Sequence, residues 1–173
     1  LMKNSIYGQM KAHWNQFLVT IGLRYDIVPY NKTSVVAPRL GFSYSISPIT
    51  KFNLALGKYY QAPDYWMLMN PRNEHPLKHT YTHQQVIGLE HYFAADIKGT
   101  MEIYHKTYHN KPVSIAAVTP DSLDDRKGFN DTGEGRSQGI ELFLQKKFAE
   151  KWYGTFSYSL SKSEGKDHRE GRN

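Results

Sequence analysis

Residues 36–61 read VAPRLGFSYSISPITKFNLALGKYYQ, and in this stretch apolar and polar side chains alternate on both sides of a short turn at Pro48. The apolar set before the turn is Leu40, Phe42, Tyr44 and Ile46. The set after it is Phe52, Leu54 and Leu56, with Lys58 in line with them. Because successive side chains of a β-strand point to opposite faces, this period of two predicts a pair of antiparallel strands.

The same alternation recurs along the chain and predicts eight strands. They cover residues 4–14, 16–26, 36–47, 51–61, 83–93, 96–108, 136–148 and 152–162. The links after the first, third, fifth and seventh strands are short, whereas residues 27–35, 62–82 and 109–135 form long loops. Short turns at one end and long loops at the other are typical of an antiparallel β-barrel in the bacterial outer membrane. The predicted fold is therefore all-β, an antiparallel transmembrane barrel whose long loops face outside.

A soluble β-sandwich also alternates, and strand length separates the two interpretations. Sandwich strands usually have about five or six residues. Strands of about eleven residues, tilted by about 45°, instead cover an apolar band about 25 Å tall. Aromatic residues lie beside the short turns, as in an interfacial girdle: Trp14, Phe17, Phe52, Phe93, Phe148 and Trp152.

Composition narrows the class further. The 173 residues are 39% hydrophobic, and no stretch approaches the roughly 20 apolar residues of a membrane helix. A helical membrane protein is thereby excluded. The net charge of +6 fits solvated loops and a wet lumen, with lipopolysaccharide phosphates or an anionic solute as possible partners. The absence of cysteine is compatible with a cell-surface or a cytosolic protein.

Several strings carry a resemblance to a known family. They are FLVTIGLRYD (17–26), APRLGFSYSISPITKFNLALGKYYQAPDYWML (37–68), QQVIGLEHYF (84–93), MEIYHKTYHNKPV (101–113) and GEGRSQGIELFLQKKFAEKWYGTFSYSLSKS (133–163). Together they resemble the barrel of TonB-dependent outer-membrane receptors. In the last string, Gly133, Gly135, Gly139 and Glu141 enter a strand from an extracellular loop before a short turn and the SYSLS strand.

The resemblance implies a barrel of about 22 strands around an N-terminal plug in the bacterial outer membrane. Such receptors take up ferric siderophores, haem, vitamin B12 or glycans, driven by a TonB-type inner-membrane complex. Residues 1–173 are then expected to be a partial barrel from a longer protein, without the plug, the energy-coupling box and the closing strands. Its expected partners are outer-membrane lipid, lipopolysaccharide, its own plug, the coupling complex and a small-molecule or metal-chelate substrate. Nucleic acid, cofactor and resident metal are not expected.

The most plausible ligand-facing stretch rises from a strand into an aromatic loop. The candidates are Tyr59, Tyr60, Gln61, Asp64, Tyr65, Trp66 and Arg72. Amphipathic rings on a basic concave surface suit flat or catecholate ligands. A second set is expected to line the wet lumen as a charge ladder: Arg24, Arg39, Glu90, Lys98, Glu102, Glu141 and Lys147.

Other features favour structural interpretations. His75, His79 and His83 are four apart, but Pro71 and Pro76 argue against the helix that would align them. Four aspartates match no calcium-loop spacing and are expected to be solvated: Asp121, Asp124, Asp125 and Asp131. Inward glycines are expected where the wall bends or lies against a plug: Gly22, Gly41, Gly57, Gly88 and Gly139.

Two other functional classes stay open. An outer-membrane barrel enzyme, a lipid acyltransferase or protease, needs a nucleophile beside a base. No histidine shares a strand face with the inward serines, which are Ser43, Ser45, Ser157 and Ser159. We therefore predict that the protein is not an enzyme. A small structural barrel of eight strands would have to close residue 162 against residue 4, which the inward glycines do not suit.

Overall fold

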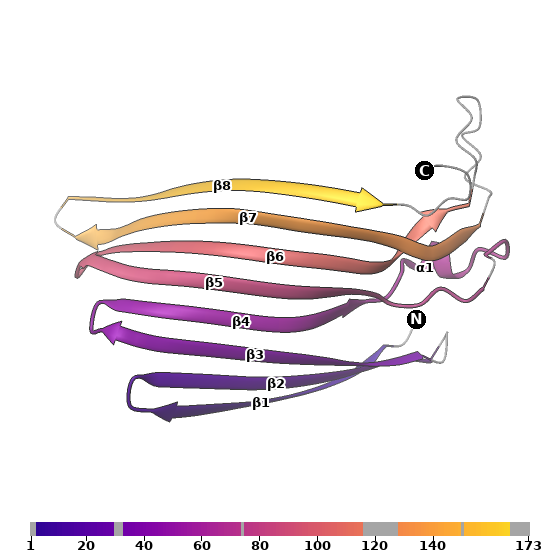
Figure 1. Cartoon of the computed structure of the whole chain (residues 1–173), viewed down its shortest axis with the longest axis horizontal. Helices are drawn as coiled ribbons and strands as arrows, with labels where there is room; N and C mark the ends of the chain where they lie inside the picture. Colours follow the sequence, from indigo (N-terminus) through magenta and orange to yellow (C-terminus); the bar gives the residue numbers. More distant parts are fainter. Residues whose placement is uncertain (1–2, 30–32, 74, 116–127, 150, 167–173) are drawn as a thin grey trace.

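The computed structural model describes residues 3–29, 33–73, 75–115, 128–149 and 151–166, and within them the chain forms a single antiparallel sheet (Figure 1). Its elements are β1 (Asn4–Trp14), β2 (Phe17–Val28), β3 (Thr33–Ser47), β4 (Thr50–Gln61), α1 (Tyr65–Leu68), β5 (Thr80–Ala94), β6 (Ile97–Ser114), β7 (Phe129–Ala149) and β8 (Trp152–Lys166). The strands lie in sequence order, each paired with the next, so that β1 and β8 form two open edges. All eight predicted strands are confirmed.

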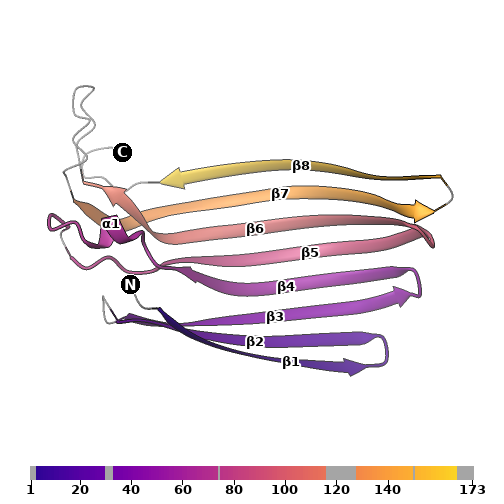
Figure 2. The ribbon, with the colours of Figure 1, turned by 180° about the vertical axis from the view of Figure 1, so that it is seen from behind.

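Short turns gather at one end of the sheet and the longer connections, with α1, at the other (Figures 1 and 2). The turn between β1 and β2 is tight, and its Asn15 has a φ of 52°, a left-handed conformation that asparagine tolerates. Register shifts follow Ser45, Tyr92 and Lys146, all beside short turns. Residue 150, in the predicted short link after the seventh strand, lies outside the described residues.

The strands are longer than predicted, and nearly all of the extra length lies at the long-loop end. There β6 continues to Ser114 and β7 begins at Phe129. Backbone pairing continues through polar residues such as Lys111 and Asn130, where apolar alternation no longer marks a strand. The expected loops 27–35, 62–82 and 109–135 are correspondingly shorter.

Register sorts the side chains onto two faces, because residues directly opposite each other share a face. Ile21 on β2 faces the same side as Leu40 on β3 and Leu56 on β4. This outer face carries most of the large exposed hydrophobic side chains, including Ile21 at 51% exposure and Leu160 at 61%. The opposite, inner face carries the polar set, so the predicted division of the alternating residues is confirmed.

The apolar stripe on the outer face runs diagonally across the strands. On β2 it reaches Ile27, whereas on β8 it ends at Leu160. When paired residues are followed from strand to strand, Leu160 on β8 lies in the same row as Val19 on β2. Between β2 and β8, the long-loop boundary of the stripe therefore shifts by the separation of Val19 and Ile27. Strands about 4.8 Å apart and tilted by about 40° should displace the boundary by about seven residues over this span. The diagonal stripe is therefore the signature of tilted strands crossing a layer of fixed thickness.

The connection between β4 and β5 reaches the long-loop end of β3, where Thr33 Oγ1 lies 3.2 Å from His79 Nδ1. Leu77 in this connection is only 1% exposed, and it is buried like the inward Val28 and Ala37, both at 2%. The long-loop end therefore has a small core of its own.

No helix within the described ranges is long and apolar enough to cross a membrane.

Candidate ligand-binding wall

Tyrosine rings cover glycines on the inner face, in the half of the sheet nearer the long loops. A Cβ added at Gly57 would lie 2.6 Å from a ring carbon of Tyr59, and one at Gly22 would lie 3.2 Å from the Tyr7 hydroxyl. The Tyr104 hydroxyl would lie 2.8 Å from a Cβ at Gly139. The glycines thus leave room for rings to lie along the wall. Tyr108 faces Gly135 in the same manner, with a distance of 3.7 Å.

This arrangement adds to the role expected for the inward glycines. Gly22, Gly57 and Gly139 accommodate rings of this same chain. Gly88 lies against the side chain of Glu102, and Gly41 against Thr20.

Cations lie against the same rings. The Arg39 guanidinium carbon is 4.6 Å from the centre of the Tyr59 ring, and Lys106 Nζ is 4.6 Å from the centre of Tyr104. Lys111 Nζ lies 5.1 Å from the centre of Tyr108. We call Tyr7, Arg39, Tyr59, Tyr104, Lys106 and Tyr108 the tyrosine wall. It combines flat aromatic surfaces with positive charge, which suits an anionic ligand with aromatic groups.

Arg39 has donor capacity to spare. Its Nε is buried and has no hydrogen-bond partner among the residues that the structure describes. Arg24, in the neighbouring row, is instead occupied by Asp26, with Nε 2.9 Å from Asp26 Oδ1. Of these two predicted inward cations, Arg39 is the one whose charge has no carboxylate partner among the described residues.

The aromatic candidate stretch is divided between the faces. Tyr59 and Gln61 fall on the inner face, whereas Tyr60 pairs with Tyr81 on the outer face, with ring centres 5.8 Å apart. The structure therefore does not bring Tyr60 together with Tyr59. Asp64 precedes the short helix α1, and its carbonyl accepts hydrogen bonds from the amides of Met67 and Leu68.

Tyr65 and Trp66 lie on α1 and are exposed at 48% and 58%, above the long-loop end. The Trp66 ring meets Phe129 edge-on, with centres 5.2 Å apart. Arg72 lies in the same connection, and its backbone carbonyl packs against Gly128. The candidate ligand-binding residues of this loop are thus held at the long-loop end of the sheet, beside the start of β7.

Two anchors hold this connection. The Asp131 carboxylate, 7% exposed, accepts a 3.0 Å hydrogen bond from the Lys78 amide and lies 3.6 Å from His75 Nε2. At the other anchor, His79 is 4% exposed, and its Nδ1 lies 3.2 Å from Thr33 Oγ1. Burial is the main cause that lowers the pKa of His79 below its ordinary value of 6.5, and the nearby Lys3 adds to the effect.

The three spaced histidines do not converge. His75 faces Asp131, His79 is buried beside Thr33, and His83 lies on the outer face of β5. No group of ligating side chains within the described ranges is arranged for a metal ion. Asp121, Asp124 and Asp125 lie outside those ranges, whereas Asp131 is buried rather than solvated as expected.

The remaining predicted lumen charges lie nearer the short turns. Glu90 and Lys98 form an ion pair of 2.7 Å between β5 and β6. Glu102 and Glu141 are directly opposite each other on β6 and β7. Lys147 lies within the irregular pairing after Lys146, where its amide donates to the Asp96 carbonyl at 2.8 Å. The inward Ser43 donates to Asn53 Oδ1 at 2.6 Å.

Sequence reasoning missed four members of the tyrosine wall: Tyr7, Tyr104, Lys106 and Tyr108. Their signal was present, because each falls at an inward position of its strand. The second part of the signal was an inward glycine on the adjacent strand, as with Gly139 opposite Tyr104. That pairing requires the register between strands, which alternation within one strand does not give.

Comparisons with known proteins identify the family. The model of the TonB-dependent receptor-like β-barrel matches residues 2–173. No curated protein sequence matches this chain.

Solved structures share the fold at low identity. The FrpB iron transporter from Neisseria meningitidis superimposes with a TM-score of 0.74 at 16% identity, covering 97% of this chain and 26% of that one. The outer membrane transporter YddB from Escherichia coli gives 0.73 at 14% identity, with coverage of 94% and 24%. The siderophore receptor PirA from Pseudomonas aeruginosa gives 0.72 at 15% identity, with coverage of 92% and 32%. This chain thus spans about a quarter to a third of the length of these structures. It belongs to the TonB-dependent receptor-like β-barrel family, and its sheet is a wall of an outer-membrane barrel.

Proposed function

We propose that this chain forms part of the wall of an outer-membrane receptor that captures a scarce nutrient and imports it with energy from the inner membrane. The family match supports receptor and transporter function rather than catalysis. The tyrosine wall is the observation that carries the proposal, because it presents rings and unshared positive charge near the long-loop end. The rest of the barrel, of about 22 strands, and a plug inside it would complete the receptor.

The favoured substrate is an anionic ferric chelate with aromatic groups. Arg39 and Lys106 supply charge, and the tyrosines supply flat apolar surface. Similar solved structures include a siderophore receptor and a ferric enterobactin receptor from Pseudomonas aeruginosa. An uncharged glycan or cobalamin would use the rings but not the cations.

Capture is expected to begin at the loops. Tyr65 and Trp66 lie on α1 at the long-loop end and are exposed, so a ligand is expected to meet them first. Tyr59 and Gln61 then lead from the loop to the inner face. This path requires the long-loop end to face the outside and the turn at Pro48 to face the periplasm.

The test is ligand binding by the full-length receptor that contains this chain. Arg39→Gln and Lys106→Gln should each weaken a ferric catecholate by about five- to thirtyfold, corresponding to about 1–2 kcal/mol for a partly desolvated cation. Lys51→Gln is the matched control, because Lys51 is also inward but lies beside a short turn. Equal affinities for all three variants would contradict the assigned site, and tighter binding of an uncharged glycan would contradict the substrate class.

Transport supplies the second test. Uptake of the bound chelate by intact cells should stop when the proton gradient is collapsed, whereas surface binding should persist. Uptake that continues without the gradient would favour a passive pore.

A further inference from the structure

The sheet contains a stretch, near its long-loop end, where β3 and β4 are neighbours without backbone pairing. β3 pairs with β2 as far as Thr33, and β4 pairs with β5 as far as Gln61. Between β3 and β4, however, the pairing of these described residues ends at Arg39 and Gly57. The two strands diverge beyond this point, toward the long-loop end (Figures 1 and 2). We call the unpaired stretch the joint, and it consists of residues 33–38 of β3 and 58–61 of β4.

Pro38 explains where the pairing stops. The amides of successive residues in a strand point alternately to its two neighbouring strands. The Ser45 amide donates to the Gln16 carbonyl, beside β2, at 2.9 Å. Pro38 lies an odd number of positions from Ser45 along an uninterrupted register, so its backbone nitrogen points toward β4. Because proline has no N–H to donate, the sequence itself ends the pairing of β3 with β4 inside the sheet.

The connection between β4 and β5 closes the joint with side chains in place of backbone pairing. Pro63, Leu77 and His79 of this connection are buried, and Ala37 on the β3 side of the joint is only 2% exposed. The contact of His79 with Thr33, described above, links the connection to β3. The wall at this point is therefore held by a small number of side chains.

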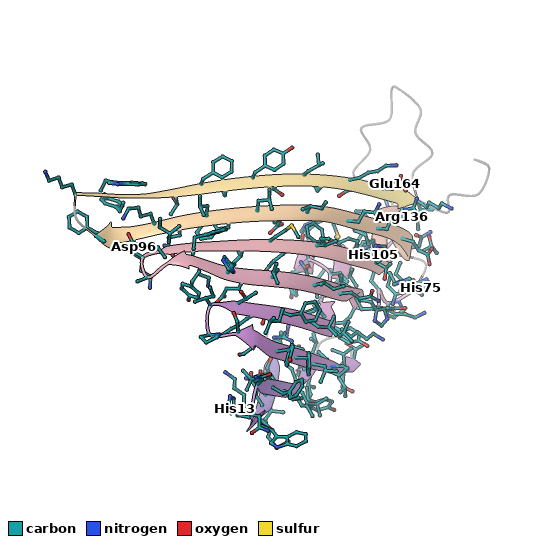
Figure 3. The ribbon with its side chains drawn as sticks, turned by 60° about the vertical axis from the view of Figure 1, so that its left-hand side comes forward. His13, His75, Asp96, His105, Arg136 and Glu164 are labelled. Carbon is teal, nitrogen blue, oxygen red and sulfur yellow. The ribbon has the colours of Figure 1, made fainter. Side chains whose placement is uncertain are left out.

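The other polar contacts of the connection lead to β6 and β7. Asp131 on β7 accepts a hydrogen bond from the Lys78 amide and faces His75. Asn110 on β6 donates its side-chain amide to the His79 carbonyl at 3.3 Å, and its own carbonyl accepts from Thr80 Oγ1 at 3.0 Å. Figure 3 shows His75 at the long-loop end of the sheet. The connection is thus fastened to the β4–β8 part of the sheet, and His79 joins it to the β1–β3 part.

The surroundings of His79 do not favour an added proton. Its Nε2 is buried and has no hydrogen-bond partner among the described residues. Thr33 and Asn110 are neutral, and burial together with the charge of Lys3 lowers the pKa of His79. Asp26 is the nearby carboxylate, but it is already shared by Arg24 Nε at 2.9 Å and Lys3 Nζ at 3.9 Å. A protonated His79 would therefore leave this position for water.

We propose that the joint is a pH-sensitive seam in the barrel wall: protonation of His79 breaks its contact with Thr33 and lets β3 separate from the connection between β4 and β5. Asp131 and Asn110 keep the connection on β6 and β7 during this change. The contact of His75 with Asp131 even gains charge when His75 is protonated, so the two histidines respond to acid in opposite directions. Arg39 and Tyr59 face each other across the base of the joint, so its opening pulls apart two members of the tyrosine wall.

The experiment measures distances between paired spin labels in the full-length receptor in lipid bilayers, by double electron–electron resonance. One pair, at Ser34 and Gln138, crosses the joint, and the other pair, at Gln61 and Gln138, lies within the β4–β8 part. All three positions are exposed. The distance from Ser34 to Gln138 should lengthen and its distribution should broaden between about pH 7.5 and about pH 5. The distance from Gln61 to Gln138 should stay constant.

Three variants identify the cause of the shift. His79→Gln should abolish it, whereas the matched control His75→Gln should retain it. Pro38→Val restores an amide that points toward β4, so it should reduce the shift by allowing the joint to pair. Heat-modifiable gel mobility reports whether each variant is folded.

Three results would overturn the proposal. The first is a distance across the joint that does not change with pH in the unaltered receptor. The second is an equal change within the β4–β8 part, which would place the movement elsewhere. The third is a shift of unchanged size in His79→Gln or in Pro38→Val, which would exclude that residue from the device.

Discussion

The two faces of this sheet share one backbone but follow different rules. On the outer face, Ile, Leu, Phe, Tyr and Met occupy equivalent positions, and a glycine there, Gly8, has open space where a Cβ would be. On the inner face, particular residues fit each other, as Gly57 fits the Tyr59 ring. Lipid requires only that a side chain be apolar, whereas the tyrosine wall requires a shape. Substitutions should therefore be judged by polarity on one face and by volume on the other.

Reversing polarity on the outer face should have the largest effect. Arg in place of Ile21, near the middle of the apolar stripe on β2, should cost about 2–4 kcal/mol of unfolding free energy. Arg in place of its neighbour Thr20 should cost about 1 kcal/mol or less, because Thr20 faces the wet lumen. The measurement is denaturant unfolding of the complete protein in lipid bilayers. Equal losses for the two variants would mean that the faces are wrongly assigned.

Adding one methyl group should separate the faces next. Gly57→Ala should cost about 1 kcal/mol and move the Tyr59 ring away from Arg39, because the new Cβ would lie 2.6 Å from that ring. Gly8→Ala has nothing within 4 Å of its Cβ and should be neutral or stabilising by less than about 1 kcal/mol. Unfolding in lipid bilayers checks both values. Removing the ring with Tyr59→Ala should abolish most of the Gly57→Ala cost, and full additivity of the two substitutions would contradict the contact.

Acidification should loosen the connection between β4 and β5, with a smaller effect. Burial lowers the pKa of His79 in the folded protein below 6.5. As pH falls below 6.5, the released chain takes up a proton that folded His79 resists, so docking weakens progressively down to the lowered pKa. The protection of the amides from residue 75 to residue 80, measured relative to their chemical exchange rate, should therefore fall between pH 7.5 and pH 5. In the His79→Gln variant, amide protection relative to the chemical exchange rate should no longer depend on pH in this range. If that dependence is unchanged, His79 is excluded as its source.

The smallest effect should lie at a short turn. Lys146 donates a hydrogen bond to Asp96 and thereby holds the pKa of that carboxyl below its ordinary value of 3.8. A lowered carboxyl pKa stabilises the fold at pH values above 3.8, and this contribution is lost as pH falls through the lowered value. Between pH 5 and pH 2, the unfolding midpoint of the Asp96→Asn variant should fall slightly less than that of the unaltered protein. A variant as pH-sensitive as the unaltered protein would show that the pair contributes nothing.

Sequence predicted the outer face well and the inner face poorly, and the reason is physical. Alternation within one strand, as from Phe17 to Tyr25, reveals which residues avoid water. It placed all eight strands and the division of their faces. It did not give the strand ends beyond the apolar stripe, where Lys111 and Asn130 continue the sheet through backbone pairing alone.

The candidate site was predicted only in part for the same reason. Tyr59 and Arg39 fall inward as expected, but their contact depends on Gly57 and on the path of the side chains. Tyr104 meets Gly139 across two strands that are joined by a long connection. The helix α1 and the burial of Asp131 depend on loop packing, for which no periodic signal exists in the sequence.

The central claim is that a tilted sheet crosses the membrane with one face in lipid and the other in water. Single cysteines along β2 and β8 test it most directly, because the chain contains no cysteine of its own. A water-soluble thiol reagent should label inward positions such as Thr20 and Ser159 and spare outward positions such as Ile21 and Tyr158. Protection of outward positions should end after Ile27 on β2 but after Leu160 on β8, which the register places four rows apart. Labelling without a period of two, or protection that ends in the same row on both strands, would contradict the account.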